Sequence, residues 1–160
     1  MTPLAWIIGW FLPACAAAGA LGFPQPALMD MGKVQRPASP NTALSAPAGT
    51  TPTPDVVTPR YPVPAPVLFA GVRAVAEAQP RTFLAAEYAA AGQVHYVVRS
   101  AVFNFPDLVT AQVTEDGPDA STLVLYSRSV YGRSDLGVNR SRVTTWLAAL
   151  DRTLNSANER

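Results

Sequence analysis

The sequence predicts an α+β fold in which a four-stranded, mostly antiparallel sheet is flanked by an N-terminal and a C-terminal helix. Two observations predict the helices: apolar residues recur at helical spacing over residues 67–79 and again after residue 139. A third predicts the sheet, because the residues between them contain four short runs rich in β-branched and aromatic side chains. An apolar N-terminal helix and a Pro-rich spacer are expected to precede this unit.

Composition divides the 160-residue chain into three parts. Residues 1–29 contain no Asp, Glu, Lys or Arg, and residues 24–66 hold eleven of the sixteen prolines. We expect a membrane anchor or signal segment at 1–23, a Pro-rich linker at 24–66 and a small α+β domain at 67–157. From Val67 to the end of the chain nine arginines balance nine carboxylates, which argues against binding of nucleic acid.

The N-terminal segment has three competing interpretations, beside the alternative of a buried core helix, and membrane lipid is its expected partner. Leu4 to Phe23 is an uncharged, mostly apolar run, close to the length of a bilayer-crossing helix. It is either an uncleaved membrane helix or a cleaved signal peptide. The third interpretation is a lipoprotein signal, because Leu12-Pro13-Ala14-Cys15 resembles a lipobox and would make Cys15 the lipidated residue. Each interpretation predicts a membrane-anchored or exported protein, with its domain on the extracytoplasmic side.

The Pro-rich linker is expected to be an extended, semi-rigid spacer. Proline fixes φ and removes an amide donor, which disfavours both helix and central strand. The spacer is either a plain tether or, through Tyr61–Pro66, a segment that docks in an aromatic groove of a partner.

The elements of the domain follow in order along the chain. Apolar residues at 68, 72, 75 and 76 form one face of the first helix, which Pro80 ends. The acidic turn at 115–119 separates the last two strands. The four strands are expected at residues 82–89, 94–102, 105–114 and 121–129.

The C-terminal helix has the clearest pattern. Asn139 is a suitable N-terminal cap, and the apolar positions that follow it obey the i, i+3, i+4, i+7 rule. These positions are Val143, Trp146, Leu147, Leu150 and Leu154. We expect both helices to cover one face of the sheet.

The segment 127–143 between the last strand and this helix is the candidate site. Its glycines permit positive φ, free amides begin the helix, and arginine side chains bind phosphate or carboxylate well. The segment is therefore either an anion-binding surface or a structural hub in which Asp135 accepts backbone amides. The ligand-binding candidates are Arg128, Arg133, Asp135, Asn139, Arg140 and Arg142, with Gly132 and Gly137 as structural loop residues.

No catalytic residue is assigned. His95 is the only histidine, and nothing in the spacing places it near Ser127 or Ser129 and an acid, as a catalytic triad requires. A hydrolase that uses Asp135 or Asp107 is an alternative. No phosphate loop, dinucleotide fingerprint, zinc motif or calcium loop occurs, so no cofactor or metal is expected.

Several stretches resemble a bacterial and plastid family known as domain of unknown function 1499. The matching residues are Ser127, Ser129, Gly132, Ser134, Asp135, Gly137, Val138, Asn139 and Arg142, with Ser39-Pro40-Asn41, Pro80-Arg81-Thr82, Arg99-Ser100, Phe105 and Asp107 upstream. The chain departs from the family pattern where Thr42 replaces a cysteine and Leu108 replaces the second acid of a pair. The resemblance implies a membrane-anchored or exported protein, and it implies no reaction.

Together these observations predict a non-catalytic, membrane-tethered binding or accessory domain of the cell envelope, which recognises an anionic group through residues 128–142. The alternatives are an envelope hydrolase and an accessory subunit of a larger membrane complex, with a protein partner.

Overall fold

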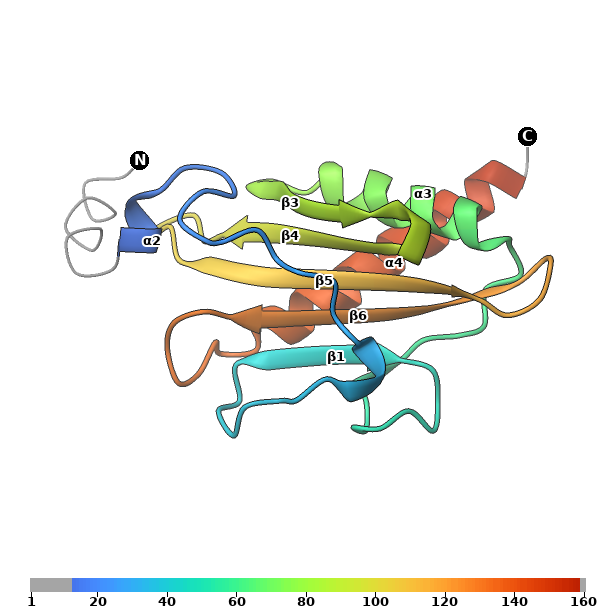
Figure 1. The fold of residues 1–160 in the computed structure, drawn as a ribbon, viewed down its shortest axis with the longest axis horizontal. Coiled ribbons are helices and arrows are strands. Elements are labelled where there is room, and N and C mark those ends of the chain that lie inside the picture. The colour runs from blue at the N-terminus through green and yellow to red at the C-terminus, as the bar shows by residue number, and fades with distance from the viewer. Residues whose placement is uncertain (1–12, 159–160) are drawn as a thin grey trace.

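The computed structural model describes residues 13–158 and has an α+β fold (Figure 1). A six-stranded mixed sheet carries two long helices on one face. In chain order the elements are α2 (Pro13–Ala16), η1 (Met31–Lys33), β1 (Thr42–Ala46), β2 (Val56–Val57), α3 (Ala65–Glu77), β3 (Thr82–Tyr88), η2 (Ala89–Ala91), β4 (Gln93–Arg99), β5 (Pro106–Glu115), β6 (Ser121–Ser129) and α4 (Val138–Asn158).

The four predicted strands are present as β3 to β6 and pair in sequence order as an antiparallel meander. The predicted number of four strands is wrong, because the sheet order is β2-β1-β6-β5-β4-β3. β1 pairs antiparallel with β6, and β2 pairs parallel with β1. Pro106 is the first residue of β5, where the missing amide costs the sheet least.

Both additional strands come from the Pro-rich stretch, so its expected role as an extended spacer is corrected. β1 has the sequence Thr-Ala-Leu-Ser-Ala and contains no proline. The nearest prolines are Pro40 before it and Pro47 after it. The prolines therefore shape the turns around a short strand whose amides are all available for pairing.

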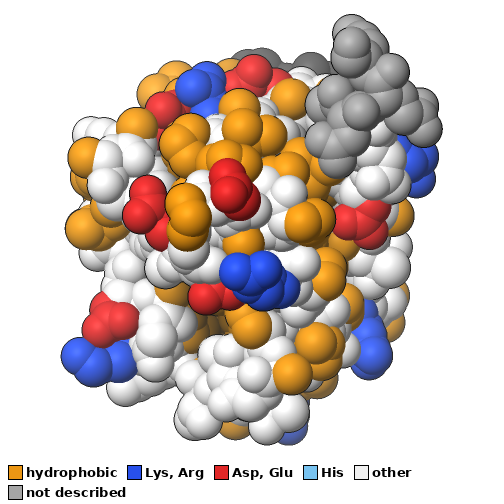
Figure 2. Space-filling model, turned by 90° about the vertical axis from the view of Figure 1, so that its right-hand side faces the viewer, with side chains coloured by type: hydrophobic (Ala, Val, Ile, Leu, Met, Phe, Trp, Pro, Cys, Tyr) orange, Lys and Arg blue, Asp and Glu red, His pale blue; other side chains and the backbone are white. Residues whose placement is uncertain are grey.

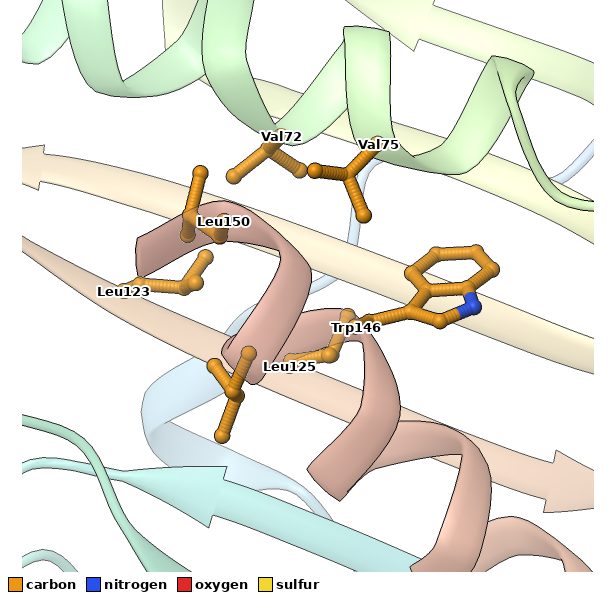
Figure 3. Close-up of a pocket in the computed structure, with 7 residues that line it drawn as sticks. Val72, Val75, Leu123, Leu125, Trp146 and Leu150 are labelled. Carbon is orange, nitrogen blue, oxygen red and sulfur yellow. The ribbon is translucent and has the colours of Figure 1, made fainter. Parts of the chain in front are cut away.

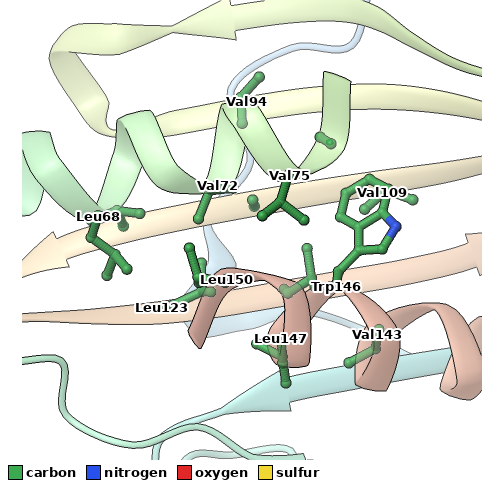
Figure 4. Close-up of a cluster of buried hydrophobic side chains, with 14 of the residues drawn as sticks. Leu68, Val72, Val75, Val94, Val109, Leu123, Val143, Trp146, Leu147 and Leu150 are labelled. Carbon is green, nitrogen blue, oxygen red and sulfur yellow. The ribbon is translucent and has the colours of Figure 1, made fainter. Parts of the chain in front are cut away.

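The main hydrophobic core lies between the sheet and the two helices (Figure 4). The apolar stripe predicted for the C-terminal helix is buried along its full length. Trp146 packs edge-to-face on Tyr96 of β4, with ring centroids 6.0 Å apart. α3 crosses α4 closely because Gly71 lacks a side chain; a Cβ there would lie 3.0 Å from Leu150 Cδ1.

The core holds one very small cavity (Figure 3). Its volume is about 10 Å³, roughly what one water molecule needs. It is lined by Val72, Val75, Leu123, Leu125, Trp146, Leu147 and Leu150. This lining supplies no acid, base or nucleophile, so we regard the cavity as a packing defect.

The opposite face of the sheet is covered by residues 24–36, which we call the covering segment. In Figure 1 this segment crosses in front of β4 and β5 toward β1. The backbone amide of Met29 donates to the side-chain oxygen of Gln93 on β4, and the side-chain amide of Gln93 donates to the backbone oxygen of Met29, both at 2.8 Å. Met31 and Val34 pack with Leu44 of β1. Helices, sheet and covering segment thus form three layers.

The expected apolar N-terminal helix is not confirmed. Residues 1–12 lie outside the described part of the chain, and residues 13–16 form the four-residue helix α2. Among the described residues, no helix has both the length and the apolar character needed to cross a bilayer.

The position of β1 gives a direct test of the spacer hypothesis. We expect Leu44→Asp to lower the free energy of unfolding by about 3 kcal/mol or more, because Leu44 is 1% exposed between β6 and the covering segment. Ala48→Asp, four residues further on in an exposed loop, should change it by less than about 0.5 kcal/mol. Urea unfolding of both variants measures the difference; equal, small effects would contradict the burial of β1.

Candidate functional site

The segment between β6 and α4 is built around Asn139, whose side chain is fully buried. The Asn139 side-chain oxygen accepts hydrogen bonds from Ser127 Oγ at 2.5 Å and Arg142 Nη1 at 2.7 Å. The side-chain amide donates to the backbone oxygen of Asn41 and to Ser129 Oγ, both at 2.9 Å. The side chain of Asn139 therefore connects α4 to the end of β6 and to the residue before β1. We call Asn41, Asp107, Ser127, Ser129, Asp135, Asn139 and Arg142 the Asn139 cluster.

Asp135 caps α4. Its Oδ1 accepts from the amide of Gly137 at 3.0 Å and its Oδ2 from the amide of Asn139 at 2.8 Å. Burial opposes ionisation of this carboxyl, but the amides of Asn139 and Gly137 outweigh burial and lower its pKa. A lowered pKa keeps Asp135 ionised, so it is a poor proton donor. Two of the amides expected to attract an external anion, those of Gly137 and Asn139, are already paired with this carboxylate.

Arg142 points inward and pairs with Asp107 at the start of β5. Arg142 Nη2 lies 2.6 Å from Asp107 Oδ2, and the two side chains are only 11% and 12% exposed. Arg142 Nη1 also donates to Ser127 Oγ at 2.9 Å. Removing one partner of such a pair would leave a buried charge without compensation. The charge of Arg142 is therefore neutralised inside the protein.

Asn41 connects the cluster to the glycine loop. Its side-chain amide donates to the backbone oxygen of Gly132 at 2.7 Å, and its own backbone oxygen accepts from the amide of Ser129 at 3.0 Å. Gly132 and Gly137 have φ of +88° and +81°, the left-handed region that favours glycine. Sequence reasoning assigned Asn41 to the spacer and missed this role, although the Ser39-Pro40-Asn41 motif was the available signal.

The remaining arginines diverge from the cluster. Arg140 Nη2 approaches the backbone oxygen of Asp55 at 3.4 Å. Arg128 lies on the opposite face of the sheet, in a shallow groove beside the covering segment and Tyr126. Arg133 is exposed and makes no hydrogen bond or ion pair with the described residues. The structure thus brings Asp135, Asn139 and Arg142 together and separates them from Arg128, Arg133 and Arg140.

His95 is on the other face of the sheet, away from both candidate acids. It is 2% exposed beneath the covering segment. Its Nε2 lies 2.9 Å from Gln93 Oε1 and its Nδ1 lies 3.0 Å from Thr110 Oγ1. Burial lowers the pKa of this imidazole. Both ring nitrogens are engaged, and the sheet separates His95 from Asp107 and Asp135.

The capping role of Asp135 predicts a pH-dependent loss of stability. Because its folded-state pKa is lowered, its contribution is present above the unfolded pKa of about 4 and lost as the pH falls through the folded pKa. We expect Asp135→Asn to cost about 1 kcal/mol at pH 7, because it removes the negative charge at the start of α4 and one of the two acceptor oxygens, and progressively less below pH 4.

Urea unfolding at pH 7, 4 and 3 measures this trend. Asp119→Asn, an exposed acid in the turn between β5 and β6, is the control and should change stability by less than about 0.5 kcal/mol. A constant loss for Asp135→Asn at all three pH values would refute the capping role.

A second polar cluster, which sequence reasoning missed, holds the N-terminal segment. Arg99 ends β4 and is 3% exposed. Its guanidinium donates to the backbone oxygens of Ala14 at 2.8 Å, Gly19 at 2.6 Å and Leu21 at 2.7 Å. Burial lowers the pKa of this guanidinium, and carbonyl dipoles on three sides compensate its charge.

Asn104, in the turn between β4 and β5, holds the same segment. Its side-chain amide donates to the backbone oxygens of Cys15 at 2.6 Å and Ala17 at 3.1 Å. Its side-chain oxygen accepts from Arg81 Nη2 at 2.5 Å. We call Arg81, Arg99 and Asn104, with residues 14–21, the N-terminal clasp. The sequence signals for it were Pro80-Arg81-Thr82 and Arg99-Ser100, two of the stretches that match the family pattern.

The clasp buries Cys15 completely. Burial also raises the pKa of its thiol. In this position the side chain has no free space for a lipid, so the folded state described here is that of an unmodified cysteine. Whether Cys15 is lipidated in another state of the chain stays a prediction from the sequence.

The clasp predicts that the reactivity of Cys15 depends on Arg99. A charge-assisted hydrogen bond contributes about 1.5–3 kcal/mol, so we expect Arg99→Met to accelerate maleimide labelling of Cys15 by roughly tenfold or more. Since Cys15 is the only cysteine, the labelling rate reports on this segment alone. Arg140→Met, which removes an exposed arginine elsewhere, should leave the rate unchanged; equal rates in wild type and Arg99→Met would disprove the clasp.

Comparison with known proteins adds a family and no reaction. The family model described as "Protein of unknown function (DUF1499)" matches residues 34–150. No curated protein and no solved structure matches the chain. The matched range includes β1, Asn41 and the whole Asn139 cluster. The chain therefore belongs to the DUF1499 family.

Proposed function

We propose that this protein is a non-catalytic accessory domain of the cell envelope, tethered to a membrane by its N-terminal segment. The observation that carries the proposal is the N-terminal clasp. It fastens residues 14–21, the second half of the apolar segment, to the folded domain through Arg99 and Asn104. Residues 1–12, which precede this segment in the chain, contain no charged side chain and two tryptophans. An uncharged, Trp-containing stretch of this kind suits a lipid environment.

A non-catalytic role is supported by how the candidate acids and the base are used. Asp135 is committed to the amides of Gly137 and Asn139, and Asp107 to Arg142. His95 is committed to Gln93 and Thr110 on the other side of the sheet. Catalytic acid–base pairs need to converge on a shared space that a substrate enters. Asp107 and Asp135 belong to the same cluster, but both are hydrogen-bonded within the protein there, and His95 lies on the other side of the sheet. The geometry therefore does not favour the hydrolase alternative.

Fewer of residues 128–142 are available to bind an anion than the sequence predicts. Arg142 is neutralised by Asp107, and the amides of Gly137 and Asn139 are paired with Asp135. Arg133 is the exposed arginine within the loop that has no partner among the described residues. We therefore propose that the loop contacts an anionic group through Arg133, with the Asn139 cluster holding the loop in shape.

Membrane association is tested by extraction of the full chain from native membranes. We expect the wild type to stay in the pellet after alkaline carbonate treatment, because residues 1–12 are apolar. A double variant, Ile7→Asp with Ile8→Asp, should move to the soluble fraction, since a charged side chain in hydrocarbon costs about 2.5–3.5 kcal/mol.

The control is Ala48→Asp, which adds an acid in an exposed loop and should not alter the distribution. Intact mass of the pelleted protein establishes that residues 1–12 are present. A wild-type chain that retains these residues and is recovered in the soluble fraction would overturn the proposed tether.

A further inference from the structure

We propose that one end of the domain lies directly on the lipid bilayer, as a second membrane contact beside the N-terminal tether. This inference rests on the proposed tether and adds a surface and an orientation to it. The surface, which we call the apolar end, is formed by Leu21, Val102, Phe103, Leu136 and Val138. In Figure 1 it is the end of the sheet at which α2, the turn between β4 and β5, and the loop between β6 and α4 meet.

The five side chains are large, apolar and exposed. Leu136 is 94% exposed and Leu21 is 70% exposed. They come from three segments far apart in the sequence, and the segments are in contact. Asn104 binds the backbone of the N-terminal segment, and Phe105 packs near Tyr131 with ring centroids 6.3 Å apart. A gathering of exposed apolar side chains from separate segments marks an interaction surface.

The strained backbone of Leu136 supports a functional role for its exposed side chain. Three non-glycine residues in the described chain have positive φ: Arg81, Asn104 and Leu136. The side chains of Arg81 and Asn104 make hydrogen bonds within the clasp. Leu136 has φ of +53°, a conformation that costs about 1 kcal/mol, and its side chain gains almost no burial in return.

Acidic side chains are also distributed unevenly, with few at the apolar end and several at the opposite end. The three segments of the apolar end, 13–23, 100–105 and 130–138, contain one acid, Asp135, which is paired with backbone amides. Figure 2 views the opposite end of the molecule, where acidic and basic side chains lie among apolar ones. The turn at 115–119 exposes Glu115, Asp116 and Asp119 at the far end of β5.

The position of the tether identifies the bilayer as the occupant. The uncharged residues 1–12 join the described chain at Pro13, which starts α2 at the apolar end. A bilayer that holds those residues is therefore next to Leu136 and Phe103. Arg133 is exposed on the same loop, and it suits contact with anionic headgroups above the buried apolar side chains. Surface contact of this kind, with apolar side chains at the headgroup boundary, is typical of interfacial proteins.

The test places an environment-sensitive fluorophore at the apolar end of the full chain. Leu136→Cys in a Cys15→Ala background is labelled with a nitrobenzoxadiazole dye. Replacement and labelling at this position leave the core packing intact because Leu136 is 94% exposed. Asp119→Cys in the same background is the matched control at the opposite end. Both proteins are mixed with vesicles of phosphatidylcholine and phosphatidylglycerol, and flotation is measured together with dye emission.

We expect both proteins to float with the vesicles, with a blue shift and at least a twofold rise in emission for the dye at position 136 alone. Lipids that carry a quencher in the upper acyl chain should then quench position 136 and not position 119. Flotation without any change at position 136 would overturn the apolar end as a membrane contact and leave the tether intact. Failure of both proteins to float would overturn the tether and the inference together. A blue-shifted dye at position 136 before vesicles are added would show that residues 1–12 or a second copy covers this end, which also overturns it.

Discussion

The fold depends on the requirement that the buried amide of Asn139 be fully hydrogen-bonded. An unpaired buried polar group costs about 1–3 kcal/mol, so a fully buried asparagine is stable only where all its partners are in place. Its partners come from the approach to β1, from β6 and from α4. The helix can therefore pack on the sheet in one register, and β1 can join β6 in one register. A core of aliphatic side chains alone would tolerate several such arrangements.

This requirement accounts for the dense polar motif between β6 and α4. Side chains alternate along β6, so Ser127 and Ser129 point toward α4 while Arg128 points to the covering segment. Arg142 is one turn along α4 from Asn139, on the same helix face, and so reaches Ser127 and Asp107. The sequence of this motif is typical of a binding loop, but most of its polar side chains form hydrogen bonds inside the protein. Arg133 and Leu136 are the residues of the loop that we propose contact other molecules.

Much of the fold was predictable because its signals are local. Strands β3 to β6 and the buried stripe of α4 follow from periodicity, which needs no knowledge of partners. β1 was missed because proline density around residues 37–54 suggested a spacer, whereas its strand contains no proline. The direction of Arg142 was not predictable either, since it is decided by Asp107, which lies 35 residues earlier. The family resemblance was predictable from the same motif, because its glycines adopt positive φ and Asn139 needs several buried hydrogen-bond partners.

The N-terminal clasp shows how a tether and a fold become interdependent. Residues 17–23 form no regular secondary structure, so their carbonyls have no neighbouring strand or helix to bind. A guanidinium suits this situation because its donors lie in one plane and reach several acceptors at once. Arg99 binds two such carbonyls, those of Gly19 and Leu21, together with the carbonyl of Ala14 in α2, and the segment in turn shields the buried charge. Neither partner is stable alone: without residues 14–21 the charge of Arg99 would lose most of its acceptors, and without Arg99 the carbonyls would be buried unpaired. The domain therefore holds residues 14–21 of its apolar N-terminal segment as part of its own structure.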